Sequence, residues 1–309
     1  MHATLGVALF LFGNIIARDP SLAMGPREPT TPSPYWLAAL DVFNAGDNLP
    51  CQTNGKDVSS DATSADNWRV AIAWGRTLVA LAYEATKQQS TPPSPATARP
   101  LTPRAQQPRP HNITLPPPAR FHPRSPLAAI TALRSAGGLA HTRATPPELL
   151  TLAADQFARG IFHMPHAPTP PTPTSTPTST PTHVRGAPLR PHVLFTLASE
   201  VLAVAERLED AGPRARWAAW ADAVFLQMHI EADVDAWRAP LGAARGRCWL
   251  VMGSARADEM EDALERGQVG VLGSKEAEEA RAGLGTGESF NRWGFWLLGG
   301  GVLLNRFVL

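Results

Sequence analysis

The chain has 309 residues, a formal net charge of +1 and 31 prolines. This length allows two domains, and the prolines fall mainly in two tracts, which leaves roughly two-thirds of the chain to build a core. A net charge so close to zero argues against a nucleic-acid-binding surface or a polybasic membrane patch. We therefore expect neither direct binding of nucleic acid nor electrostatic attachment to a membrane.

The chain begins with an apolar stretch, TLGVALFLFGNIIARDP, over residues 4–20. As a secretory segment it would be followed by small residues suited to cleavage at 21–23, but no Lys or Arg precedes it and Asn14 interrupts it. As the apolar helix of a repeat it would end at Arg18-Asp19-Pro20, because proline stops a helix. The repeat helix is favoured, since its pattern occurs again further along the chain.

Two more helices are expected before the first proline-rich tract. Residues 35–46, YWLAALDVFNAG, predict one, and residues 66–89 predict the other, with Asp66 or Asn67 as N-cap. The apolar side chains of the second keep helical spacing and are Trp68, Ile72, Leu78, Leu81 and Ala82.

The two proline-rich tracts cover residues 90–126 and 164–191. Proline fixes φ and lacks an amide donor, so neither tract is expected to form a helix or a central strand. We predict disordered, solvated insertions of polyproline-II character in a fold with an open surface. Their Pro-x-x-Pro and Thr-Pro steps suit SH3- or WW-type modules, and a passive linker role is the alternative. Proline-directed phosphorylation would act at Ser94, Ser125, Thr172 and Thr176.

Between the tracts, residues 127–163 contain a helical segment. TPPELLTLAADQFARGIFHMP opens with Thr145 as N-cap, Pro146 at the first helical position and Glu148 two residues later, which is a capping box. The predicted buried stripe of this helix is Leu149, Leu152, Ala153, Gln156, Phe157 and Ile161.

Two strongly periodic segments follow the second tract, at residues 192–212 and 214–238. Alternation of the kind that strands require is absent throughout, so the predicted fold class is all-α. Trp217, Trp220 and Trp237 are a candidate aromatic ligand site. Core packing is favoured, because Trp217 and Trp220 stand three positions apart on one helix face.

Three predicted helices share a bulky residue directly before a glycine, with an apolar or long side chain three positions after it. The pairs are Phe12-Gly13, Trp74-Gly75 and Met252-Gly253. Glycine lowers helix propensity, so its place in mid-helix indicates a neighbouring helix at close range, as in the first helix of a tetratricopeptide (TPR) hairpin. Trp249 joins the third pair at the TPR spacing, and Ala39 and Phe43 match the second TPR helix.

These observations predict degenerate TPR-like hairpins, with an irregular helical bundle as the alternative. The loop between Gly13 and Ala39 is too long for a regular array. The expected organisation is TPR-like helices at residues 1–89, an insertion at 90–126, a helical segment at 127–163, an insertion at 164–191, a TPR-like domain at 192–284 and an apolar tail at 285–309.

The tail contains FWLLGGGVLL. Its apolar part, residues 293–309, is shorter than the about 20 residues that span a bilayer and includes Asn305 and Arg306. A packing helix, an interfacial helix or a translated intron is therefore favoured over a membrane tail anchor.

Metal and redox chemistry are not expected. Two cysteines, Cys51 and Cys248, make no disulfide framework, and both are predicted to be reduced thiols. A metal needs three or four convergent ligands, whereas the candidate histidines lie in or beside the proline-rich tracts, at His111, His122, His163 and His166.

Catalytic motifs are also absent from the sequence. Three serines, Ser199, Ser254 and Ser289, lack a Gly-x-Ser-x-Gly frame. The carboxylates of residues 231–238 and 257–265 are interpreted as solvated helix faces, since acid–base catalysis requires a cleft that perturbs their pKa values. We predict that the chain is not an enzyme, with no catalytic, cofactor-binding or metal-binding residues and no cofactor.

Five segments together resemble the fungal enhancer of translation termination family: residues 8–23, 34–50, 67–85, 152–168 and 217–265. The similarity runs from Leu5 to Leu284 without the proline-rich tracts. It implies a TPR-like, nuclear, non-catalytic protein that promotes correct stop-codon recognition and affects gene regulation, and it implies no catalytic residue. The resemblance implies more chain before the first helix and more repeats after Leu284, so a truncated or mis-spliced gene model is one interpretation of this sequence.

The predicted function is therefore a scaffold whose stacked helices form a groove for protein partners, including components of the translation termination machinery, in the nucleus. The alternative is a membrane-associated or secreted helical protein that uses the apolar segments 5–17 and 293–309. That alternative predicts glycosylation of Asn112, which lies in an Asn-Ile-Thr sequon.

Overall fold

The computed structural model describes residues 2–23, 28–47, 61–89, 144–165, 190–231 and 234–297 of the chain. Within these ranges the regular elements are eight α-helices and two short 3-10 helices, and there is no strand. The prediction of an all-α class is confirmed.

The chain divides into two compact units, Met1–His163 and Met164–Leu309. The helices described in the first unit are α1 (His2–Arg18), α2 (Ser33–Asp47), α3 (Asp61–Gln89) and α6 (Pro146–His163), with the 3-10 helix η1 (Pro20–Leu22). Those of the second are α7 (Arg190–Ala205), α8 (Ala211–Glu231), α9 (Val234–Glu265) and α10 (Lys275–Leu297), with η3 (Val269–Gly273).

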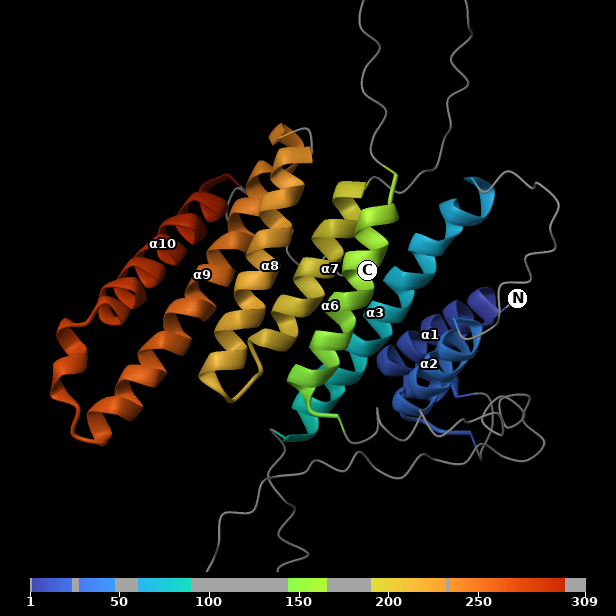
Figure 1. Cartoon of the computed structure of the whole chain (residues 1–309), viewed down its shortest axis with the longest axis horizontal. Coiled ribbons are helices and arrows are strands. Elements are labelled where there is room, and N and C mark those ends of the chain that lie inside the picture. The colour runs from blue at the N-terminus through green and yellow to red at the C-terminus, as the bar shows by residue number, and fades with distance from the viewer. Residues whose placement is uncertain are drawn as a thin grey trace, which may run out of the picture. The chain divides into compact units, whose positions relative to one another are not determined.

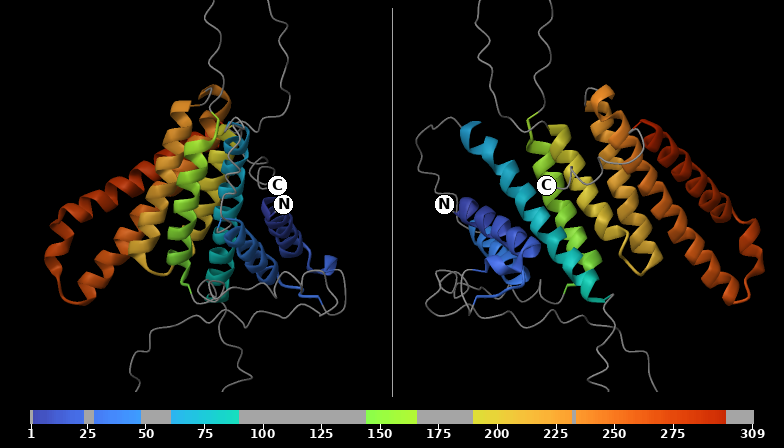
Figure 2. Two further views of the ribbon diagram at one scale, coloured as in Figure 1. Left: turned by 45° about the vertical axis from the view of Figure 1, so that its right-hand side comes forward. Right: turned by 180° about the vertical axis from the view of Figure 1, so that it is seen from behind.

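Each unit is built from helices packed against their neighbours. Extensive contacts join α1 to α2 and α3 to α6 in the first unit, and they join α7 to α8, α8 to α9 and α9 to α10 in succession in the second (Figure 1). The α3–α6 pair forms although residues 90–145 separate the two helices in the chain, and the view from behind shows them side by side as well (Figure 2). The segments expected at residues 1–89 and 127–163 therefore belong to one compact unit.

Glycines allow the paired helices to approach closely. The Trp36 indole packs on Gly13, the Phe157 ring on Gly75 and the Leu284 side chain on Gly253, so that a Cβ at any of these glycines would overlap its neighbour. The expectation that these three mid-helix glycines each face a neighbouring helix is confirmed.

Two of the pairs use glycine reciprocally. In α3–α6, Phe157 covers Gly75 while Ile72, three residues before Gly75, covers Gly160, three residues after Phe157. The α9–α10 pair repeats this arrangement with Leu284 on Gly253 and Leu250 on Gly287. The reciprocal contacts require the two helices of each pair to run antiparallel, because the sequence number rises along one helix as it falls along the other.

The start of α6 follows its predicted cap. The backbone N–H and the hydroxyl of Thr145 both donate to Glu148 Oε2, at 2.7 and 2.9 Å, and Leu149 N–H donates to the Thr145 carbonyl at 3.0 Å. The hydroxyl bonds the same carboxylate instead of a backbone N–H, which is a variation on the usual capping box.

This cap makes α6 sensitive to acid. The hydrogen bond from the Thr145 backbone, followed by that from its hydroxyl, lowers the pKa of Glu148. A carboxyl whose pKa is lowered by folding stabilises the folded state above its unfolded pKa, and this contribution is lost as the pH falls through the folded pKa. We expect Glu148→Gln to reduce the fall in melting temperature between pH 7 and pH 3, as circular dichroism would measure. Asp155→Asn, at an exposed position of the same helix, is the control, and an equal fall in wild type and Glu148→Gln would contradict the prediction.

Three boundary or burial predictions were wrong. Helix α3 begins at Asp61, five residues before Asp66; of the added residues, Ala62 and Ala65 have high helix propensity. The second proline-rich tract is shorter than predicted, since α7 already begins at Arg190. Pro191 lies in the first turn of this helix, where a backbone amide donor is not needed. The periodic segment at residues 214–238 contains parts of two helices, most of α8 and the start of α9.

The third error concerns Leu152, which is 39% exposed. The buried face of α6 is centred on Leu149, Ala153 and Phe157, and it also includes Leu150 and Gly160. Leu152 therefore stands beyond the edge of that face.

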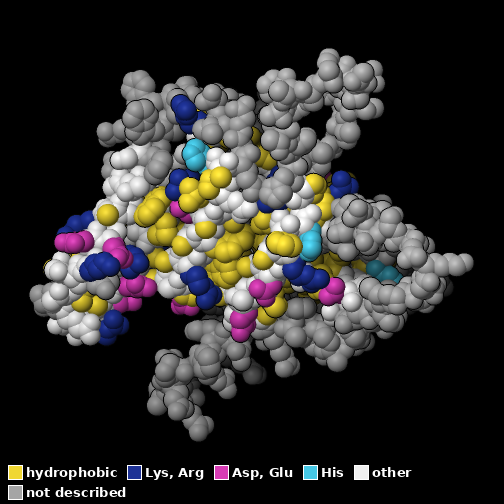
Figure 3. Space-filling view, turned by 45° about the horizontal axis from the view of Figure 1, so that its top comes forward, with side chains coloured by type: hydrophobic (Ala, Val, Ile, Leu, Met, Phe, Trp, Pro, Cys, Tyr) yellow, Lys and Arg dark blue, Asp and Glu magenta, His cyan; other side chains and the backbone are white. Residues whose placement is uncertain are grey.

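Ion pairs link helices in the second unit. Arg245 on α9 donates to Asp222 on α8 at 2.7 Å, and Arg256 on α9 contacts Glu279 on α10 at 3.0 Å. Arg214 on α8 also pairs with Asp258 on α9. Charged side chains of both signs lie together at the left of Figure 3, where α9 and α10 are found.

Candidate functional site

A pocket of ≈ 360 Å³ opens in the first unit, lined by residues from α1, α2, α3 and α6. We call it the four-helix pocket. Its lining residues are His2, Ala3, Val42, Phe43, Gly46, Asp47, Val70, Ala71, Trp74, Gln156, Arg159 and His163. This volume lies near the lower end of the range for small binding sites, about 300–1,000 Å³, and suits one large side chain.

The apolar part of the pocket is aromatic. The rings of Phe43 on α2 and Trp74 on α3 are stacked, with centroids 6.0 Å apart and an interplanar angle of 18°. Phe43 is held by the helix pair behind it, because its ring packs on Gly6 of α1. Phe43 is 2% exposed, so it supports the half-buried ring of Trp74, which is the aromatic surface that the pocket offers to a ligand.

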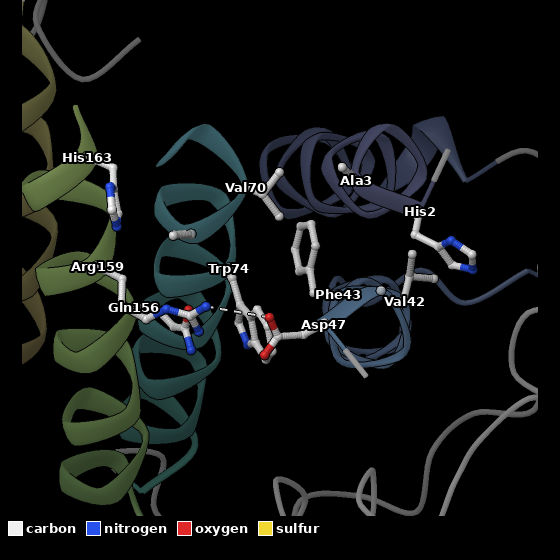
Figure 4. A pocket seen from close by; sticks show the side chains of 12 residues that line it. His2, Ala3, Val42, Phe43, Asp47, Val70, Trp74, Gln156, Arg159 and His163 are labelled. Carbon is white, nitrogen blue, oxygen red and sulfur yellow. Dashed lines mark hydrogen bonds and ion pairs between the residues drawn. The ribbon is translucent and has the colours of Figure 1, made fainter. Parts of the chain in front are cut away.

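The polar part of the pocket joins α2 to α6. Arg159 on α6 reaches over Trp74 to Asp47 at the end of α2, with 3.5 Å between guanidinium nitrogen and carboxylate oxygen (Figure 4). The two side chains are 57% and 52% exposed. An ion pair this open to solvent contributes little to stability, about 0–1 kcal/mol, so it can separate at small cost.

Gln156 carries an unpaired polar atom at this site. Its Oε1 is buried and has no hydrogen-bond partner, and its side chain lies beside Arg159 near Trp74 (Figure 4). Buried polar groups are nearly always hydrogen-bonded, since an unpaired one costs about 1–3 kcal/mol. The pocket therefore presents an acceptor that a bound N–H or O–H donor would satisfy.

The sequence did not identify this site. Gln156 was placed on the buried stripe of its helix, and His163 was weighed as a metal ligand, whereas the structure brings both to one pocket with Asp47 and Arg159. A glutamine in an otherwise apolar stripe was the available signal, because a buried amide needs a partner.

The three tryptophans of the candidate aromatic site pack against different neighbours, as expected for core packing. Trp217 is buried, Trp220 is half-buried, and their rings meet edge to face at 6.5 Å. Trp237 lies instead against Phe195 of α7, with ring centroids 5.4 Å apart.

The remaining reactive side chains have structural surroundings. Cys248 is a free thiol, fully buried, and burial followed by the nearby Asp222 carboxylate raises its pKa far above the ordinary value. It is therefore held as an unreactive neutral thiol. The hydroxyls of Ser254 and Ser289 donate to backbone carbonyls of their own helices. Among the described residues, no group of three or more His, Cys, Asp or Glu side chains could hold a metal.

Helix α1 corresponds to the apolar stretch at the start of the sequence and ends at Arg18, as its Arg-Asp-Pro sequence predicts. One face packs on α2, and the other leaves Leu5, Leu11 and Ile15 exposed. In the part of the chain that the structure describes, no helix is long and apolar enough to cross a membrane.

Several predicted features lie outside the described residues. They include most of both proline-rich tracts with their serine and threonine sites, the end of the tail, Cys51, Asn112 and the histidines His111, His122 and His166. The predictions for them stay predictions.

Fold and pocket together define an all-α protein of antiparallel helix pairs with one side-chain-sized pocket described in its first unit. Comparison with known protein families, with curated proteins and with solved structures finds no match for this chain.

Proposed function

We propose that the chain is a non-catalytic helical scaffold that binds a partner protein through the four-helix pocket. The observation that carries this proposal is the unpaired Gln156 Oε1 beside the stacked rings of Phe43 and Trp74. An aromatic surface with an unsatisfied acceptor is suited to a side chain that has an apolar body and a polar N–H or O–H tip, such as tryptophan or tyrosine. Residues of this kind dominate the binding energy of protein interfaces.

The particular process that we propose is translation termination. Its support is the sequence resemblance to the fungal enhancer of translation termination family, which implies a nuclear protein that acts through partners. TPR-like pairing of the helices belongs to the same proposal. The antiparallel pairs with close glycine contacts are compatible with it.

Gln156→Leu tests this function, because it is expected to act in opposite directions on stability and on activity. Leucine keeps the approximate shape of the side chain and removes the unpaired oxygen, so the free energy of unfolding should rise by about 1 kcal/mol. The same change removes the acceptor for a partner. In fungal cells that lack the wild-type chain, we expect Gln156→Leu to leave stop-codon readthrough elevated, while a dual-reporter assay shows that wild type restores it.

Gln88→Leu is the matched control, since it makes the same chemical change at an exposed position of α3. It should restore readthrough as wild type does, and immunoblots should show equal amounts of all three proteins. Full restoration by Gln156→Leu would exclude the pocket from the function. Unchanged readthrough in cells without the chain would exclude a role in termination.

A further inference from the structure

The hydrogen-bonding groups around the four-helix pocket are unbalanced. Asp47 is the one carboxylate among its lining residues, whereas Arg159, His163 and His2 supply a guanidinium and two imidazoles. Arg159 and His163 stand four positions apart on α6 and so share a helix face. The lining therefore offers more N–H donors for an anion than carboxylates for a cation.

The Arg159–Asp47 pair is a contact that a stronger anion can replace. Its single N–O distance of 3.5 Å is long, and both side chains are more than half exposed. A carboxylate free to approach Arg159 can instead form two parallel hydrogen bonds with the guanidinium, the stronger geometry for this pair. Displacing Asp47 would leave its carboxylate in solvent, where an unpaired charge is tolerated.

The anchor and the anion sites are adjacent. Gln156 and Arg159 lie three positions apart on α6, and Figure 4 shows both side chains extending from that helix toward Trp74. A ligand whose aromatic side chain donates to Gln156 therefore carries its neighbouring residues past Arg159. A short extended peptide matches this spacing, because side chains two positions apart point to the same face and are about 6.6 Å apart along the chain. Residues three positions apart on a helix, such as Gln156 and Arg159, are about 5–6 Å apart.

We propose that the four-helix pocket binds an acidic segment of a partner protein, with one aromatic side chain against Trp74 and a carboxylate two positions along the segment that displaces Asp47 from Arg159. This inference rests on the proposed function and adds the chemistry of the partner. Asp47 acts in it as an internal competitor, which occupies Arg159 in the free protein and lowers the affinity for weakly acidic sequences.

The test uses the full chain and three fluorescein-labelled peptides with one tryptophan anchor each: acidic Glu-Asp-Trp-Asp-Glu, neutral Gln-Asn-Trp-Asn-Gln and basic Lys-Arg-Trp-Arg-Lys. Fluorescence anisotropy measures their dissociation constants at low ionic strength. We expect the acidic peptide to bind about tenfold more tightly than the basic one, since a charge-assisted hydrogen bond supplies a factor of about this size.

Two variants of the ion pair are expected to change affinity in opposite directions. Asp47→Asn should lower the dissociation constant of the acidic peptide about two- to fivefold, because it frees Arg159 from an exposed ion pair. Arg159→Gln should abolish the preference for the acidic peptide. Arg18→Gln removes an exposed positive charge at the other end of α1 and should change nothing.

The outcomes separate this inference from the function on which it rests. Equal affinity for the three peptides, weakened in each case by Gln156→Leu, would overturn the acidic partner and keep the pocket as a binding site. A preference for the basic peptide would overturn the acidic partner and would indicate that Asp47, not Arg159, recognises the ligand. Binding of none of the peptides, or binding that Gln156→Leu does not weaken, would overturn the proposed function of the pocket as well.

Discussion

Phe157→Ala is expected to lower the free energy of unfolding of the first unit by about 3–5 kcal/mol. The Phe157 side chain is fully buried on α6, and its ring lies directly on Gly75 of α3. Removal of the ring leaves a cavity that the flat surface of a glycine cannot fill from the other helix. Hydrogen exchange of α3 and α6 peptides, followed by mass spectrometry, measures the loss within this unit alone.

Phe162→Ala is the matched control for this prediction. Phe162 lies on the same helix but is 81% exposed, so its loss should change the free energy by less than about 0.5 kcal/mol. Gly75→Ala adds a second check, because its new Cβ would overlap the Phe157 ring but would occupy the cavity left by Phe157→Ala. It should destabilise the wild type and stabilise Phe157→Ala. Equal effects of Gly75→Ala in both backgrounds would show that the two residues are not coupled.

Gly253→Ala is expected to destabilise the α9–α10 pair by about 1–3 kcal/mol. Its Cβ would lie 2.9 Å from the backbone nitrogen of Leu284 and 2.9 Å from Cγ of the same residue. A side chain can rotate away from such a contact, but a helix backbone cannot, so α10 must shift as a body. The destabilisation should appear as faster hydrogen exchange in both helices.

Gly242→Ala is the control on the same helix, with nothing within 4 Å of its new Cβ. Alanine has the higher helix propensity, so this change should stabilise α9 by up to about 1 kcal/mol. The two substitutions are chemically identical and differ only in what the added methyl group meets. Changes of the same sign at both positions would contradict a close-contact role for Gly253.

The structural features that depend on near neighbours in the sequence could be predicted without the structure. The all-α class follows from helical periodicity, and the end of α1 follows from Arg18-Asp19-Pro20. The start of α6 at Pro146 follows from its cap, because Thr145 and Glu148 bond within one turn. Even the close helix contacts at Gly13 and Gly75 were indicated, since glycine in mid-helix is unfavourable without such a reason.

The partners of those glycines were decided by the tertiary structure. The sequence indicates that Gly75 faces a helix, but not that Phe157 supplies the ring, because residues 90–145 separate α3 from α6. Leu152 illustrates the same limit. Its helical spacing fits a buried stripe, yet the face that α6 buries is centred on Ala153 and Phe157, and Leu152 lies beyond the edge of that face.

The four-helix pocket, like the partners of the glycines, was decided by the tertiary structure. Asp47, Trp74 and Arg159 lie on three different helices and come together only when two helix pairs pack against each other. Periodicity reports which residues share a face of one helix, whereas a pocket depends on which faces meet and where the side chains fail to fill the space between them. The sequence by itself thus determined the helices, their caps and their close-contact positions, and only the packing of those helices determined the site.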